Sequence, residues 1–217
     1  MYLNSNPKIY YEKTGNGKPL ILLHGNKEDH SIFHELSEAL KNDFTIYLVD
    51  TRGHGKSEKP AEYHYKDMAE DVLKIIQYEG IENPSIFGFS DGGIIALLCA
   101  VKSPASFNKI ITAGANITVD GLGRLSQIGM MLSYWITKDK RTKMMLNEPN
   151  ISKKELSEIT CPVLVLAGEN DLIKEKHTKM IAENIVHSTL QIFPKKTHGN
   201  YVVHTDFLAK TIKNFIK

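Results

Sequence analysis

The chain has little cysteine, little charge imbalance and no long apolar stretch. Its 217 residues include only two cysteines, Cys99 and Cys161. Such sparse use fits a reducing compartment, and the spacing offers no metal-ligand pattern. The formal net charge of +2 is too small to predict a nucleic-acid or membrane partner. The longest apolar run, Ile94 to Val101, is far too short to span a bilayer.

The N-terminal residues MYLNSNPKIYYEKTG lack a basic segment followed by an apolar one, so no secretory signal is predicted. Hydrophobic residues make up 41% and charged residues 24% of the chain, which is ordinary for a globular domain. We therefore expect a cytoplasmic protein that forms one main domain. No cofactor and no metal are expected.

Apolar runs that favour strands alternate with amphipathic segments that favour helices. The runs are nearly continuous, as in strands covered on both faces; they are Leu20–Leu23, Phe44–Val49, Ser85–Phe89, Lys109–Ala113, Val163–Ala167 and Thr189–Phe193. The helical segments are Ile32–Leu40, Lys66–Tyr78, Ile94–Val101, Thr178–Val186 and Tyr201–Ile216. The alternation predicts an α/β fold, a mostly parallel sheet with helices on both faces. Ile9–Thr14 is predicted as an edge strand.

One segment interrupts this alternation. Residues 117–158 carry no clear strand pattern and indicate two or three short helices. Ser152 and Glu155 have the spacing of a capping box for the last of them. A connection of about 40 residues is long for two consecutive strands. We therefore expect a core formed by residues 1–116 and 159–217, with a small helical cap formed by residues 117–158.

Ser90 lies at a strand-to-helix turn in the pattern Gly88-Phe-Ser90-Asp-Gly92. A sharp turn there strains the serine backbone and exposes its hydroxyl, and the flanking positions must lack side chains to avoid clashes. The pattern therefore predicts a nucleophile. The alternative is that Ser90 only caps the following helix and that the glycines ease packing.

A serine nucleophile needs a base, and the base needs an acid that orients it. His198 follows the last predicted strand, and its chain order and loop position favour it over the other eight histidines. Asp171 follows the strand that ends at Ala167, so it is the predicted acid, with Glu169 as the second choice. A solvated turn acid is the alternative for this position.

Two backbone N–H groups are predicted to stabilise an oxyanion. The N–H of Asp91 begins a helix next to the serine, where the helix dipole favours negative charge. The N–H of Asn26 lies in the loop after the Leu20–Leu23 strand, and the Asn26 side-chain amide is a further candidate. His24 and Gly25 are expected to shape that loop.

The stretches LILLHGN, VDTRGHGKS, GFSDGG, LVLAGENDLI and KKTHGNY together resemble the α/β-hydrolase family, in order and spacing across nearly the whole chain. The resemblance implies the α/β-hydrolase fold and a Ser90–His198–Asp171 triad that acts on an acyl substrate. Ser90 would attack the carbonyl, His198 would carry the proton and Asp171 would orient the imidazole.

A closer resemblance, carried by GFSDGGIIALLCAVKSP and ITAGANITVD, is to the valacyclovir hydrolase-like branch, which cleaves α-amino acid esters. It implies that the carboxylate of Asp91 binds a substrate ammonium. Asp91 could instead only favour the helix N-terminus. The cap is shorter than expected for that branch.

Methionine and aromatic side chains are frequent in the cap. Met130 and Trp135 are predicted to contact substrate, because methionine-lined surfaces adapt to varied apolar shapes. Packing of the cap on the core is the alternative. The expected activity is hydrolysis of small carboxylic esters, including α-amino acid esters. A C–C hydrolase, lactonase, amidase or acyltransferase could use the same triad, and a ligand-binding signalling module with slow turnover is the alternative outside enzymes.

Overall fold

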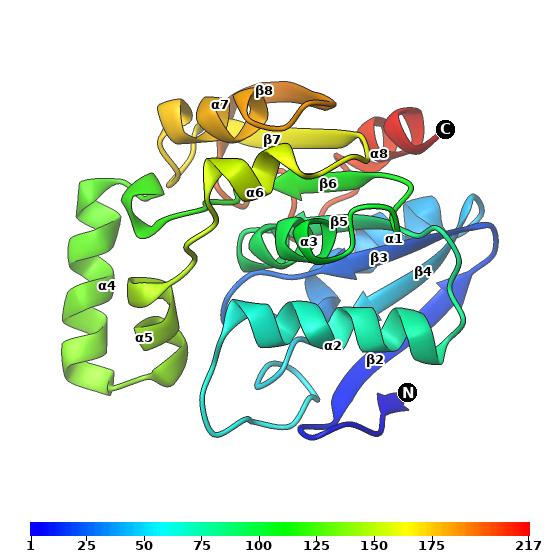
Figure 1. Ribbon diagram of the computed structural model, residues 1–217, viewed down its shortest axis with the longest axis horizontal. Coiled ribbons are helices and arrows are strands. Elements are labelled where there is room, and N and C mark those ends of the chain that lie inside the picture. Colours follow the sequence, from blue (N-terminus) through cyan, green and yellow to red (C-terminus); the bar gives the residue numbers. More distant parts are fainter.

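An eight-stranded sheet forms the centre of the computed structural model, which describes all of residues 1–217 (Figure 1). The strands follow the spatial order β1-β2-β4-β3-β5-β6-β7-β8. Their bounds are β1 Tyr2–Leu3, β2 Ile9–Gly15, β3 Lys18–Leu23, β4 Phe44–Val49, β5 Ser85–Phe89, β6 Ile110–Ala113, β7 Val163–Asn170 and β8 Ser188–Thr197. The β1–β2 and β2–β4 pairings are antiparallel, and the other five pairings are parallel. The mostly parallel sheet is confirmed.

Helices cover both faces of this sheet (Figure 1). One face carries α2 (Tyr65–Tyr78), α3 (Asp91–Lys102) and α7 (Glu175–Glu183), whose apolar residues share one core cluster with the strands. The opposite face carries α1 (His34–Leu40) and α8 (Ala209–Ile216), which pack in a second cluster. Nearly every residue of α3 is buried. This burial explains why its sequence is apolar on all sides.

The last helix is shorter than the sequence pattern predicts. It begins at Ala209 rather than Tyr201, and Tyr201–Leu208 forms turns in which His204 has a φ of 49°. A left-handed residue ends helical continuity. Tyr201 is fully buried against Phe193, with ring centroids 5.4 Å apart. Tyr201 is therefore packed into the core from a turn, and the helix that was predicted to begin there begins only at Ala209.

The segment 117–158 contains a short 3₁₀ helix, η2 (Val119–Gly121), followed by α4 (Arg124–Thr137), α5 (Lys140–Asn147) and α6 (Lys153–Ser157). Ser152 and Glu155 form the expected capping box at α6. α4 and α5 stand together at one side of the molecule (Figure 1). None of the residues of α4 is buried. None of the helices in the protein combines the length and apolarity needed to cross a membrane.

A buried ion pair fixes the loop that follows β4 to helix α2. The guanidinium of Arg52 donates to Asp71 from Nε at 2.7 Å and from a terminal nitrogen at 2.9 Å. It also donates to Asp67 at 2.9 Å. The Asp71 side chain is only 4% exposed. Burial raises the pKa of Asp71, although Arg52 opposes that rise.

Replacement of Arg52 by Leu should destabilise the fold by about 3–5 kcal/mol, because it leaves the buried Asp71 carboxylate without a partner. The double variant Arg52→Leu/Asp71→Leu should recover most of this loss. The measurement is urea unfolding of both variants and the wild type. Lys102→Leu is a matched control, because it breaks an exposed α3–α2 pair with Glu70 and should cost less than about 1 kcal/mol. Equal losses in the control and in Arg52→Leu would contradict the prediction.

Candidate active site

Ser90 occupies a sharp turn between β5 and α3, and its backbone is strained. Its φ is 53° and its ψ is −116°, a backbone conformation that residues other than glycine rarely adopt. The two flanking glycines are required by close contacts. A Cβ on Gly88 would lie 2.1 Å from the carbonyl oxygen of Gly92, and a Cβ on Gly92 would lie 2.0 Å from that of Leu23. The turn therefore exists only with these glycines, and it holds the serine at the carboxyl end of the sheet.

His198 lies directly beyond β8, between Ser90 and Asp171. Its Nε2 is 3.0 Å from Ser90 Oγ, and its Nδ1 is 2.6 Å from Asp171 Oδ1. The ring packs against Phe89, with centroids 5.1 Å apart. A Cβ on Gly114 would lie 2.8 Å from the imidazole Cε1, so the chain leaves room for the ring there. Three residues far apart in the sequence thus form one continuous chain of contacts.

Asp171 is held as an ionised acid. Its side chain is 2% exposed, and burial alone would raise its pKa. Hydrogen bonds from His198, from the Ile173 N–H at 3.0 Å and from the Gly168 N–H at 3.3 Å outweigh burial and lower the pKa of Asp171 overall. The second-choice acid, Glu169, lies elsewhere. Its carboxylate accepts the Lys195 N–H at 2.7 Å, so it links β7 to β8 and does not touch His198.

Asn26 lies in the loop after β3, and its backbone N–H donates to no protein acceptor. Its side chain, in contrast, contacts two other side chains. Oδ1 lies 3.4 Å from His54 Nε2, and the amide contacts Met145 Sδ of α5. The buried His24 bonds Gly25 O through Nδ1 at 2.7 Å and accepts the Thr51 N–H through Nε2 at 3.1 Å. His24 therefore shapes the loop, as expected.

The backbone N–H of Asp91 is the second expected oxyanion donor. Asp91 is the first residue of α3, so its N–H is one of the four that find no acceptor within the helix. It follows Ser90 directly in the chain. Neither N–H thus has an acceptor within the protein, and Asn26 lines the same cavity as Ser90.

A cavity of about 400 Å³ opens over Ser90 and His198. The loop after β3 forms one side of it, and α4 and α5 form another. The cavity is lined by Gly25, Asn26, Lys27, Glu28, Phe89, Ser90, Gly129, Met130, Ser133, Thr142, Met145, Leu172, His198 and Gly199. A volume of this size suits a small molecule.

The carboxyl group of Asp91 does not line this cavity, contrary to what the resemblance implied. Asp91 is 5% exposed, and its Oδ2 has no hydrogen-bond partner. Burial raises the pKa of Asp91 to about 7, and the neighbouring Tyr65 hydroxyl only partly opposes this rise. In this structure the Asp91 carboxyl group is therefore not placed to contact a substrate ammonium in the cavity. The sequence places Asp91 beside Ser90, but the helix turns the carboxyl group into the core.

The two cap residues expected to contact substrate differ in placement. Met130 lines the cavity, together with Gly129 and Ser133 of the same helix. Trp135 is 74% exposed and does not line it. The two positions are five residues apart on α4, which puts them on different sides of a helix with 3.6 residues per turn. The geometry therefore offers no substrate contact for Trp135.

Glu28 is a cavity residue that the sequence reasoning missed. It is half-buried, lines the cavity and accepts the Gly25 N–H through Oε2 at 2.9 Å. Burial raises the pKa of Glu28, and the Gly25 N–H and the nearby His198 oppose that rise. The carboxylate forms no ion pair, whereas the neighbouring Lys27 is 3.6 Å from Asp139. Its position two residues beyond Asn26 was the available signal in the sequence.

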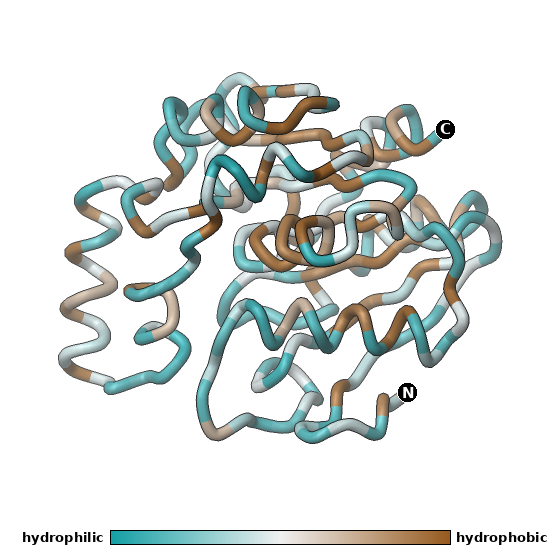
Figure 2. Tube along the Cα trace, viewed as in Figure 1, coloured by the Kyte–Doolittle hydropathy of each residue, from teal (hydrophilic) through white to brown (hydrophobic).

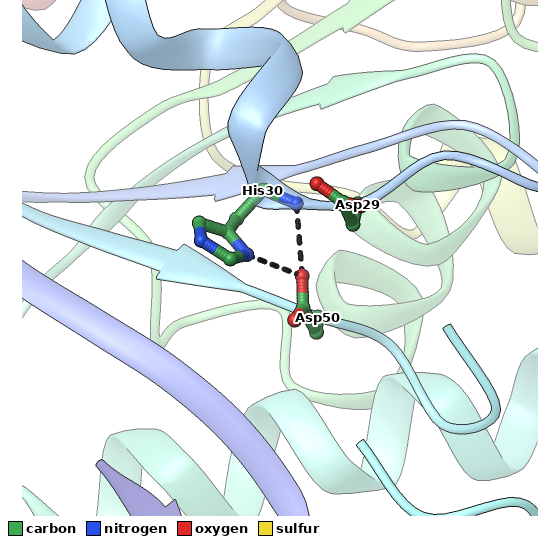
Figure 3. A group of neighbouring side chains, drawn as sticks. All are labelled: Asp29, His30 and Asp50. Carbon is green, nitrogen blue, oxygen red and sulfur yellow. Dashed lines mark hydrogen bonds and ion pairs between the residues drawn. The ribbon is translucent and has the colours of Figure 1, made fainter. Parts of the chain in front are cut away.

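Asp29, His30 and Asp50 lie close enough together to be considered as metal ligands (Figure 3). Asp50 is fully buried, and its Oδ1 accepts both the backbone N–H and Nδ1–H of His30 at 2.8 Å. Its Oδ2 accepts the Lys56 N–H at 2.8 Å. Asp29 caps the short helix η1 (His30–Phe33) through the Ser31 N–H. These bonds already engage Asp50, so the group ties the end of β4 to its neighbouring loops.

Comparison with known proteins places this geometry in a family. Residues 18–128, about half of the chain, match the family described as the alpha/beta hydrolase fold. The AB hydrolase superfamily protein YisY of Bacillus subtilis is 38% identical over 254 aligned residues, which cover 95% of this chain and 94% of that protein. The chain belongs to the α/β hydrolase fold family. This α/β hydrolase is also 26% identical to serine hydrolase BPHL of Homo sapiens, across 97% of the chain and 83% of that protein.

Solved structures show the same fold in this hydrolase. The esterase EaEST from Exiguobacterium antarcticum is 26% identical and superposes with a TM-score of 0.79, covering 97% of this chain and 96% of that one. The enol-lactonase from Burkholderia xenovorans LB400 is 18% identical with a TM-score of 0.82, covering 100% and 99%. The second likeness shows the fold alone. One fold thus carries different reactions, and the site must identify the chemistry.

The buried carboxyl of Asp91 should make stability depend on pH. Its folded-state pKa of about 7 exceeds the ordinary value of 3.8, so the folded hydrolase holds this proton more tightly than the unfolded chain does. The contribution of Asp91 to stability therefore falls as the pH rises from about 4 through 7. Asp91→Asn removes this dependence. Its stability relative to wild type should increase by about 2–3 kcal/mol between pH 5 and pH 8.5.

Urea unfolding of both proteins at the two pH values measures this change. The test is whether the difference in unfolding free energy between the two proteins changes with pH. A cost of the substitution that is the same at both pH values does not affect this test. Parallel pH profiles of the two proteins would show that the Asp91 carboxyl titrates normally.

Proposed function

We propose that this protein is a serine hydrolase that cleaves small carboxylic esters, with Ser90 as nucleophile, His198 as base and Asp171 as orienting acid. The observation that carries the proposal is the continuous contact chain from Asp171 through His198 to a strained, cavity-facing Ser90. A serine that only capped a helix would need none of these contacts. The cavity and the esterase-like relatives support the proposal further.

In the first half of the reaction, Ser90 Oγ attacks the ester carbonyl while His198 Nε2 takes its proton. The charge on the carbonyl oxygen is stabilised by the backbone N–H groups of Asn26 and Asp91. The imidazolium is stabilised by Asp171, whose ionised state follows from its hydrogen bonds. His198 then protonates the leaving alkoxide, the C–O bond breaks, and an acyl-Ser90 ester remains.

In the second half, a water molecule takes the place of the alcohol. His198 accepts a proton from the water as it attacks the acyl carbon, and the same two N–H groups stabilise the second oxyanion. The proton then returns to Ser90 Oγ as the carboxylic acid leaves.

Ser90→Ala should lower kcat for short p-nitrophenyl esters at least about 1,000-fold, because the nucleophile is removed. Ser133→Ala is the matched control, since Ser133 lines the same cavity but has no base beside it, and it should keep near-wild-type kcat. A fluorophosphonate probe should label wild type and Ser133→Ala but not Ser90→Ala. Full activity in Ser90→Ala, or an unlabelled wild type, would contradict the proposal.

Within this class we propose α-amino acid esters as substrates, with the ammonium group bound by Glu28 rather than Asp91. Glu28 lines the cavity and forms no ion pair within the chain, because the adjacent Lys27 approaches Asp139 instead, so its carboxylate is open to a substrate ammonium. An unpaired carboxylate in a partly desolvated site attracts such a group more strongly than in water. Asp91 is buried outside the cavity.

Glu28→Gln should reduce the preference for an α-amino ester over its des-amino analogue about ten-fold or more, measured as the ratio of kcat/KM values. The glutamine amide oxygen can still accept the Gly25 N–H, so the loop is kept while the charge is lost. Asp91→Asn should leave the ratio unchanged. A drop confined to Asp91→Asn would assign the ammonium to Asp91 instead. If the wild type does not prefer the α-amino ester, the proposal of α-amino acid esters as substrates is contradicted, while the proposal of ester hydrolysis is unaffected.

A further inference from the structure

Helix α4 carries an exposed apolar stripe that neither the core nor the cavity uses. Half of the twelve large apolar side chains exposed in this structure lie on this one helix. They are Leu125 (86% exposed), Ile128 (44%), Met131 (60%), Leu132 (59%), Trp135 (74%) and Ile136 (73%). These six residues are called the α4 stripe. Figure 2 shows apolar positions recurring along this helix at the side of the molecule.

The α4 stripe is one continuous face of the helix. Leu125, Ile128, Leu132 and Trp135 follow one another at intervals of three and four residues, which aligns them along one side. The opposite side, with Gly129, Met130 and Ser133, faces the cavity. The stripe extends about 16 Å along the helix. A surface this long and apolar marks an interaction site in a folded protein.

The unpaired charges at the two ends of the α4 stripe are basic, because Asp139, which follows Lys138, is engaged by Lys27 and Arg141. Arg124 stands at its start, Lys138 follows its end, and the helix itself contains no acidic residue. The ammonium of Lys138 lies 6.0 Å from the centre of the Trp135 ring. Neither Arg124 nor Lys138 forms an ion pair, whereas Lys140 and Lys143 both approach Glu62. The net charge of +2 for the whole chain conceals this local excess.

We propose that the α4 stripe docks on an anionic lipid surface, with the helix lying in the plane of the interface. An apolar face with an aromatic residue and basic flanks is the pattern of helices that bind at such interfaces. Leu125, Ile128 and Leu132 would enter the boundary between headgroups and acyl chains. Arg124 and Lys138 would meet the anionic headgroups at the two ends. Docking of this kind is peripheral and requires no spanning helix.

A second copy of the chain suits this surface less well. Two-fold antiparallel pairing of the stripe would bring Arg124 of one copy beside Lys138 of the other. Parallel pairing would bring Arg124 and Lys138 of one copy beside the same residues of the other copy. Because α4 contains no acid, like charges would meet in either arrangement, and such contacts are unfavourable. An anionic surface complements both ends at once.

The proposal has a built-in reporter, because Trp135 is the only tryptophan. The full chain is mixed with vesicles of phosphatidylcholine alone or of phosphatidylcholine with 30% phosphatidylglycerol. We expect the fluorescence of Trp135 to shift to shorter wavelength, and the protein to sediment with the vesicles, only when phosphatidylglycerol is present. Added salt should weaken binding, because the headgroup attraction is screened.

The variant Ile128→Ser/Leu132→Ser should weaken vesicle binding at least ten-fold, because two inserted apolar side chains are lost. Arg124→Gln and Lys138→Gln should each weaken binding about five-fold. Val186→Ser is the matched control, since Val186 is 71% exposed but lies outside α4, and it should bind as wild type does. All variants should hydrolyse soluble short esters at the wild-type rate, which shows that they are folded.

Three results would overturn the proposal. The first is the absence of binding to either vesicle. The second is equal binding to both vesicles, which would remove the anionic requirement. The third is a dimer in analytical ultracentrifugation that dissociates in Ile128→Ser/Leu132→Ser, with Trp135 already shielded from acrylamide quenching without lipid. That result would assign the stripe to a second copy.

Discussion

The site depends on one steric constraint, the close approach of helix α3 to the ends of strands β3 and β5. Gly88 and Gly92 have no room for a side chain because the backbone of α3 and the end of β3 occupy that space. The chain must therefore turn within one residue, and Ser90 takes the strained conformation between them. The same turn exposes the hydroxyl, starts the helix at Asp91 and sets the distance to His198. Other elements of the site are positioned relative to this point.

Burial then decides what each acid near the turn can do. Asp171, Asp91 and Glu28 are all partly or wholly withdrawn from water, yet the pKa of Asp171 is lowered while burial raises the pKa values of Asp91 and Glu28. Asp171 receives hydrogen bonds from His198 and two backbone N–H groups, so it remains ionised. Asp91 has an oxygen without any partner, so burial favours its protonated form. Glu28 receives one backbone bond and faces a cavity, so its carboxylate is the one that a solute can reach.

The cap adds a second level of organisation. The two sides of α4 serve different environments, because Met130 and Ser133 face the cavity while Leu132 and Trp135 face outward. A helix packed on the core would bury its apolar side, whereas α4 leaves that side exposed. The alignments with relatives run over more positions than this chain has residues, so the chain is shorter than they are within the matched region. The outward apolar side of α4 is covered by no other segment of the chain.

The sequence alone determined the sheet, the turn at Ser90 and the positions of His198 and Asp171, because these follow from local patterns. Continuous apolar runs identify strands that are covered on both faces, and residues after parallel strands must meet at one edge. It could not determine which way a side chain beside the turn would point. Only the tertiary structure buries Asp91, brings Glu28 into the cavity and leaves Trp135 outside. The pattern of Tyr201–Ile216 was helical throughout, but burial of Tyr201 against Phe193 prevailed over it. Burial depends on neighbours distant in the chain, and no local pattern contains them.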